Sequence, residues 1–197
     1  GLLILGVSLS LGCRPTPTAT VRMIAGRTMG TTYSVKYLPG ESQFGDAEIA
    51  ERVQAELDEV NQQMSTYIDS SELSRFNATD STDWFEVSKD TAAVTEQALS
   101  LSNVTDGAFD VTVGPLVNLW GFGPGKPPQK MLSQQLIDET REICGYRLLQ
   151  TRLEPPALKK EIPQLSVDLS AIAKGHGVDR IARLLQELGL KSYFVEI

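Results

Sequence analysis

The sequence predicts an α+β fold in which mixed sheets carry flanking helices. Stretches at 46–67, 88–104 and 170–188 repeat apolar residues every three or four positions, as amphipathic helices do. Shorter stretches at 27–37, 84–87, 146–149 and 165–169 are rich in β-branched and aromatic residues, which are typical of strands. The chain has 197 residues, 41% hydrophobic and 22% charged, and is therefore long enough to bury a sizeable core.

The first 13 residues predict a signal segment. An apolar run from Gly1 to Gly12 is too short to cross a bilayer and has the length of a signal-peptide core. It ends in Ser-Leu-Gly-Cys13, which resembles a lipoprotein cleavage box, although Ser10 stands where a large apolar residue is usual. We expect Cys13 to carry lipid, with an ordinary cleaved signal or an uncleaved anchor as alternatives. Residues 14–21 are a Pro/Thr tether that cannot form a core, which leaves 22–197 as the folded domain.

Charge and cysteine content narrow the function classes. Eighteen basic and 25 acidic residues give a net charge of −7, which argues against a non-specific nucleic-acid binder. Exported proteins meet an oxidising compartment, but a lipidated Cys13 would leave Cys144 without a partner. We therefore expect no internal disulfide and interpret Cys144 as a small buried hydrophobe.

The helix signals follow one another along the chain. Helix 46–67 has an apolar face of residues Ile49, Val53, Leu57, Val60 and Met64. Asp69 and Glu72 form an apparent capping box that opens a short helix ending at Asn77. Ser88 caps the helix that runs to Val104, and Ser133 caps another whose inward face is Leu136, Ile137, Thr140 and Ile143.

A glycine-rich apolar stretch at 105–123 links these helices. Gly107 is expected to be a left-handed cap after the helix, Phe109–Val113 a short strand, and Gly114-Pro115 its break. Its threonines, aspartate and asparagine lie among apolar residues, so each needs a hydrogen-bond partner. Composition alone indicates a core hairpin with turn glycines. After this stretch, we expect a surface loop at 124–128, an irregular charged segment at 152–164 and an apolar strand at 191–197.

Residues 165–188 contain a candidate anion site. Asp168 stands where the expected strand gives way to a helix, and free N–H groups and the helix dipole suit a phosphate there. Lys174, one turn into the helix, can supply a cation. The alternative is an ordinary helix N-terminus with a solvated lysine. His176, the only histidine, is interpreted as packing rather than catalytic.

Several segments together resemble one family. The sequence is similar to the ApbE family, the periplasmic FAD:protein FMN transferases, in the segments TMGTTY, MSTYIDSSELSRFN, GAFDVTVGPLVNLWGFG and DLSAIAKGHGVD. The resemblance implies an ApbE-like (T-fold-like) domain. It also implies contacts to FAD by Met29, Gly30, Thr31, Tyr67, Ala108, Phe109, Asp110, Asp168 and Lys174, and Mg²⁺ ligation by the carbonyl of Ala171. The residues alone favour a strand start with a glycine bulge at 29–31 and a packing role for Tyr67 at the end of its helix.

The function implied by this resemblance is transfer of FMN from FAD to a Thr or Ser hydroxyl of an acceptor protein, with release of AMP. The acceptors would be flavoprotein subunits of membrane redox complexes, reached from the periplasmic face of the bacterial membrane by a lipid-anchored enzyme. Catalytic residues and further metal ligands of the family are expected beyond Ile197, so we expect 22–197 to be the N-terminal part of the domain, incomplete and inactive alone. Alternatives are a non-catalytic FAD-binding lipoprotein and an exported solute-binding or structural lipoprotein.

Overall fold

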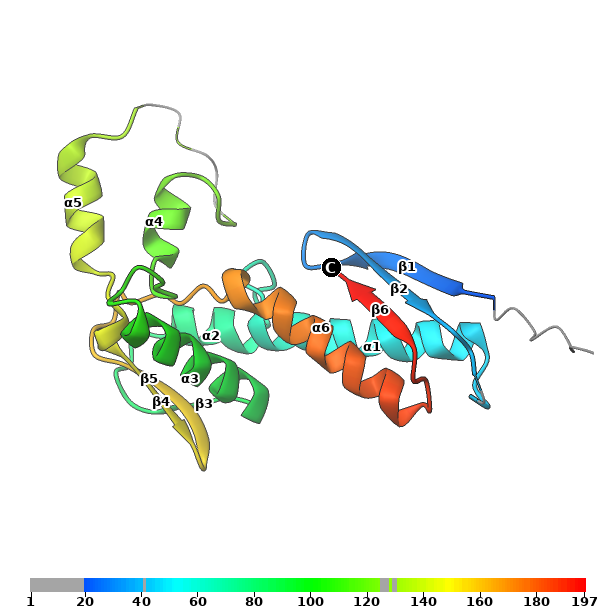
Figure 1. Cartoon of the computed structure of the whole chain (residues 1–197). Coiled ribbons are helices and arrows are strands. Elements are labelled where there is room, and N and C mark those ends of the chain that lie inside the picture. Colours follow the sequence, from blue (N-terminus) through cyan, green and yellow to red (C-terminus); the bar gives the residue numbers. More distant parts are fainter. Residues whose placement is uncertain (1–19, 41, 125–127, 129–130) are drawn as a thin grey trace, which may run out of the picture.

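A computed structural model describes residues 20–40, 42–124, 128 and 131–197. The expected signal segment, Cys13 and nearly all of the tether lie outside the described residues. The fold is α+β, as predicted. It contains two three-stranded sheets, both antiparallel, in the orders β1-β2-β6 and β3-β5-β4. The molecule is elongated, with one sheet toward each end (Figure 1). None of the helices in this part of the chain is both long and apolar enough to span a bilayer.

The first sheet covers the two longest helices. Its strands are β1 (Arg22–Thr28), β2 (Thr31–Tyr37) and β6 (Tyr193–Glu196). The sheet lies over α1 (Asp46–Met64) and α6 (Ser170–Glu187), which run side by side through the middle of the molecule (Figure 1). Ile24, Tyr33, Val35 and Tyr37 face these helices from the sheet and are buried.

The prediction of one strand over 27–37 is wrong, because the chain turns back at Met29-Gly30. Both turn residues have positive φ, 48° and 73°, as a two-residue hairpin turn of type I′ requires, and Thr28 pairs with Thr31 across it. Gly30 is typical of the second position of such a turn. Met29 is unusual at the first position, so the sequence did not predict the turn.

The second sheet contains β3 (Phe85–Glu86), β4 (Leu149–Leu153) and β5 (Pro156–Lys160), and packs against α3 (Lys89–Val104). The irregular structure expected over 152–164 is therefore wrong for its first part, which is a hairpin. The charged residues of this stretch interrupt the apolar pattern from which strands are predicted. One of these charged residues, Lys160, is fully buried. The strand expected at 146–149 is a 3-10 turn, Tyr146–Leu148, that leads into β4.

The glycine-rich stretch is a loop and a helix rather than a hairpin. Gly107 has the expected left-handed φ of 81°, and its N–H donates to the Ser102 carbonyl. The strand expected at 109–113 is absent, because the Asp110 carboxylate accepts from both the N–H and the hydroxyl of Thr112 and so turns the backbone. Gly114-Pro115 begins α4 (Gly114–Leu119), with Pro in its first turn.

Two helix predictions need correction. The cap of α2 (Glu72–Ala78) is Ser71, whose hydroxyl accepts from Ser74 N–H, and not Asp69. Glu72 reaches instead to the N–H of Ser88 at the start of α3. The inward face expected for α5 (Gln134–Glu142) is wrong, since none of its residues is buried. Both α4 and α5 project from one end of the molecule (Figure 1).

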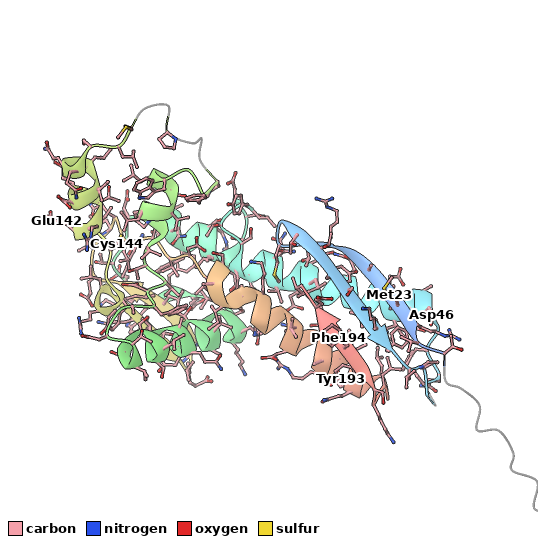
Figure 2. All side chains as sticks on the ribbon, turned by 45° about the horizontal axis from the view of Figure 1, so that its top comes forward. Met23, Asp46, Glu142, Cys144, Tyr193 and Phe194 are labelled. Atoms are coloured by element: carbon pink, nitrogen blue, oxygen red, sulfur yellow. The ribbon has the colours of Figure 1, made fainter. Side chains whose placement is uncertain are left out.

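Cys144 follows α5 and is half-buried, with its thiol 3.3 Å from the Thr140 carbonyl. Burial raises the pKa of this free thiol, so it stays protonated near neutral pH. Figure 2 shows Glu142 and Cys144 at the opposite end of the molecule from Met23 and Phe194, which lie on the first sheet.

The buried residues form two clusters. One gathers the C-terminal end of α1 with α2, α3, the second sheet and residues 165–173. The other joins the first sheet to the N-terminal part of α1 and the C-terminal part of α6. Met29 packs against both clusters, so the β1–β2 turn lies at their junction.

Candidate functional site

A cleft of about 630 Å³ opens at this junction. Its walls come from the β1–β2 turn, the end of α1 with the loop that follows, and the start of α6. They comprise Met29, Gly30, Val60, Asn61, Met64, Ser65, Thr66, Tyr67, Ile68, Asp168, Ser170, Ala173 and Lys174. The volume lies within the range of small-molecule and cofactor sites, and three chain segments distant in sequence converge there.

The turn that carries Met29 is held in a costly conformation. A left-handed φ is unfavourable for a residue with a long side chain and persists only where its surroundings impose it. The Met29 side chain lies against α6, where a Cβ added at Gly177 would come within 3.0 Å of the Met29 methyl. Gly177 therefore makes room for the residue that forms this wall of the cleft. Thr31 starts β2 and does not line the cleft.

Tyr67 stands at the mouth of the cleft with its ring exposed. The residue is 64% accessible, so it is not a packing aromatic of the core. Its hydroxyl donates to the Phe122 carbonyl at 2.8 Å, and its N–H donates to the Ser65 hydroxyl at 3.0 Å. The side chain is thus held in place while its face stays free for an aromatic ligand.

Asp168 lies on an extended segment that belongs to no sheet, so the strand predicted at 165–169 is wrong. The segment keeps the alternation of a strand: Leu165, Val167 and Leu169 are fully buried. Ser166 and Asp168, which alternate with these buried residues, face a hollow. The Asp168 N–H donates to the Val111 carbonyl at 2.7 Å, and its carboxylate accepts from Ser170 N–H at 2.8 Å.

A second hollow of about 300 Å³ adjoins the cleft and shares Thr66 and Asp168 with it. Its other walls include Asn77, Gly114 and Asn118. Asp168 therefore separates an apolar cleft, walled by Met29 and Met64, from a more polar hollow. This shape suits an elongated ligand with chemically different ends.

Lys174 lines the cleft one turn into α6 and forms no ion pair with any described residue. The positive end of the α6 dipole adds to its field, which favours an anionic ligand group. Ala171 is exposed on the same helix but lines neither hollow. Among the residues that the structure describes, no three His, Cys, Asp or Glu are grouped to hold a metal.

Ala108, Phe109 and Asp110 are not among the residues that line the two hollows. Phe109 packs against the first core cluster, and the second carboxylate oxygen of Asp110 accepts from Tyr146 N–H at 2.9 Å. This segment lies behind the site and supports it, because Val111 receives the hydrogen bond from Asp168.

His176 lies outside both hollows, as a packing residue would. Its side chain is 12% accessible, its Nε2 lies 4.0 Å from an Asp90 carboxylate oxygen, and that nitrogen has no hydrogen-bond partner among the described residues. Burial lowers the pKa of His176 despite the nearby carboxylate.

Residues that sequence reasoning missed include Asn61 and Asn77. The Asn61 amide donates to Thr28 at 3.1 Å beside the β1–β2 turn, and Asn77 lines the second hollow. Each is a polar residue near the C-terminal end of a helix, a weak signal in sequence alone.

Comparison with known proteins identifies the family. The sequence model of the ApbE family matches residues 29–197, which is most of the chain. The chain belongs to the ApbE family. This ApbE-family chain is 44% identical over its whole length to the FAD:protein FMN transferase of Haemophilus influenzae, and 47% identical over 88% of its length to that of Vibrio cholerae. It spans 58% and 52% of those two proteins.

Solved structures agree with this assignment. The flavin transferase ApbE from Vibrio cholerae matches with a TM-score of 0.86 at 44% identity, over 90% of this chain and 58% of the other. The apo flavinyl transferase ApbE from Pseudomonas stutzeri matches with a TM-score of 0.85 at 33% identity, over 93% of this chain and 60% of the other. The ApbE-like fold expected from the motifs is therefore confirmed.

Proposed function

We propose that the protein transfers FMN from FAD to a Thr or Ser hydroxyl of an acceptor flavoprotein, in a Mg²⁺-dependent reaction that releases AMP. The observation that carries this proposal is the convergence of Met29, Tyr67, Asp168 and Lys174 on one cleft at the start of α6. Relatives that share this part of the chain are named FAD:protein FMN transferases.

The reaction joins the acceptor oxygen to the FMN-side phosphorus and breaks the bond from that phosphorus to the bridging oxygen. AMP leaves with the bridging oxygen, and the hydroxyl proton passes to a base or to solvent. Negative charge on the diphosphate is the main barrier to attack, so catalysis depends on positioning and electrostatics. Mg²⁺, when bound, neutralises part of this charge.

Each cleft residue has a distinct part in this proposal. The Lys174 ammonium and the N-terminus of α6 attract the diphosphate. Asp168 is an acceptor and is suited to a ribityl hydroxyl or a ring N–H rather than to a phosphate. The exposed Tyr67 ring and the Met29 side chain offer an apolar surface to the flavin ring.

The setting we propose is the periplasmic face of the membrane, with a lipid on Cys13 as the anchor and subunits of membrane redox complexes as acceptors. The motif resemblance supports this setting, and Cys13 itself lies outside the described residues. Labelling with a clickable fatty acid, compared between the wild type and Cys13→Ser, tests the anchor.

The test of transfer is incubation of the full-length protein with FAD, Mg²⁺ and an acceptor that presents a threonine. In-gel flavin fluorescence on the acceptor, abolished by EDTA and by replacing the acceptor threonine, is expected. FAD binding without transfer to any acceptor would instead favour the non-catalytic FAD-binding alternative. Absence of FAD binding would reject both functions.

A further inference from the structure

The segment that carries Asp168 is held by a side chain in place of a neighbouring strand. The Val167 N–H donates to Asn77 Oδ1 at 2.8 Å, and Asn77 Nδ2 donates to the Val167 carbonyl at 2.8 Å. Both backbone polar groups of the buried residue Val167 are thus satisfied by a single side-chain amide 90 residues away in sequence. A side-chain amide reproduces here the two hydrogen bonds of a sheet partner.

Asn77 is itself fixed in place. Lys160, fully buried, directs its ammonium group to the carbonyls of Asn77 and Leu165, at 3.4 Å each. It also lies 5.4 Å from the centre of the Phe76 ring. The lysine therefore ties the C-terminal end of α2 to the same extended segment, and burial lowers the pKa of its ammonium group.

We propose that Asn77 is a positioning residue for the flavin site. This proposal rests on the function proposed above. Burial of Leu165 and Val167 attaches the segment to the core, but apolar contacts do not fix the rotation of a peptide plane. The two amide hydrogen bonds fix the rotation of the two peptide planes that flank Val167. They thereby set the direction in which the next residue, Asp168, faces the cleft.

The position of α6 depends on the same contact. Asp168 is followed after one residue by the first turn of α6, and its carboxylate accepts from Ser170 N–H. A rotated segment would therefore displace the helix N-terminus and Lys174 together. Asn77 lines the second hollow but not the main cleft.

Asn77→Asp tests this role, because the carboxylate keeps the acceptor for Val167 N–H and places a negative oxygen against the Val167 carbonyl. FAD affinity, measured by flavin fluorescence in the full-length protein at neutral pH, should fall about tenfold or more. The loss relative to wild type should shrink as pH falls, because a protonated carboxyl group can donate again. Replacement of a residue with a merely structural role would lower stability without this pH-dependent recovery of affinity.

Thr95→Val is the matched control. Thr95 is fully buried and its hydroxyl bonds only within α3, so this change removes a buried hydrogen bond away from the site and should leave FAD affinity unchanged. Should Asn77→Asp fail to fold by circular dichroism, Lys160→Met replaces it. That variant removes the ammonium contacts, keeps the apolar stem and should weaken FAD binding in the same direction.

Hydrogen exchange separates this proposal from the proposed function. In the absence of FAD, the amides of 165–168 should exchange faster in Asn77→Asp than in wild type, while those of α1 keep their protection. Unchanged exchange at 165–168, or unchanged FAD affinity in a wild type that binds FAD, overturns the role of Asn77. Failure of the wild type to bind FAD overturns the flavin assignment, and faster exchange would then still support the Asn77 contact.

Discussion

At the scale of single residues, the cleft contains side chains whose placement the fold alone does not explain. Tyr67 leaves its ring exposed, Lys174 has no ion-pair partner in the described part of the chain, and Met29 occupies a strained turn. Residues with these properties are better explained by a ligand than by packing. Substitution of Tyr67 or Lys174 should therefore affect binding more than folding.

Lys174→Ala should weaken FAD binding about tenfold, because the variant lacks the cation that attracts the anionic ligand. The melting temperature should be nearly unchanged, because Lys174 is exposed. The affinity of the wild type should also depend more steeply on salt than that of the variant. Lys191→Ala removes an exposed lysine outside the cleft and serves as the control. Equal dissociation constants for wild type and Lys174→Ala would show that Lys174 does not contact the diphosphate.

At the scale of elements, the glycine-rich stretch acts by contact with the segment 165–168. Gly114, at the start of α4, lies so close to Ser166 that an added Cβ would be 3.1 Å from its hydroxyl and 3.2 Å from its carbonyl oxygen. Val111, three residues earlier, accepts from Asp168. Two successive parts of the stretch thus hold the site from behind.

Gly114→Ala and Gly175→Ala should act in opposite directions. The first forces a methyl group against backbone and should destabilise the protein by about 1–3 kcal/mol and weaken FAD binding. Gly175 lies inside α6 with no atom near its added Cβ, so alanine there should stabilise the protein by about 0.5–1 kcal/mol. Urea unfolding measures both. Equal stability of Gly114→Ala and wild type would contradict the close packing at Ser166.

At the scale of the whole molecule, one arginine joins three helices. Arg180 of α6 bonds to Glu56 and Glu59 of α1 and to Asp90 of α3, and only 13% of its side chain is accessible. Burial alone would lower the pKa of Arg180, but the surrounding carboxylates raise it overall. The cluster links the helices that carry the two core clusters, and so supports the junction where the cleft opens.

Arg180→Met should destabilise the protein by about 3 kcal/mol, since it leaves partly buried carboxylates close together without a cation. Part of this loss should be recovered in acid, where the carboxylates become protonated. The control, Arg52→Met, removes an exposed pair with Glu48 and should cost about 0.5 kcal/mol or less. A similar small loss for both variants in urea unfolding would argue against a structural role for the cluster.

His176 should make the protein less stable in acid. Its pKa in the folded protein lies below the ordinary 6.5, so the unfolded chain binds a proton first as pH falls through that value. Stability is therefore unaffected by this residue above about pH 7 and declines between pH 6.5 and the folded pKa. His176→Leu should lose this decline, so its stability relative to wild type should improve at about pH 5. A constant difference between the two proteins across this range would contradict the burial effect.

The sequence predicted the helices better than the strands. Helices 46–67, 88–104 and 170–188 appear with ends within a few residues, because their periodicity and caps are local. The β4–β5 hairpin was missed because charged residues interrupt its pattern and Lys160 is buried against expectation. Of the residues that the motifs marked, Met29, Gly30, Tyr67, Asp168 and Lys174 line one cleft, whereas Ala108, Phe109 and Asp110 line neither hollow.

The sequence by itself determined the family and the α+β class, because motif identity and helical periodicity are carried by neighbouring residues. Its motifs also contain Met29, Gly30, Tyr67, Asp168 and Lys174, which line the cleft. Only the tertiary structure decided that 165–169 stands outside any sheet, with Asn77 and Val111 as its hydrogen-bond partners. The physical reason is that an extended, apolar stretch must satisfy its backbone somewhere. The partner that does so lies far away along the chain, where local patterns carry no information.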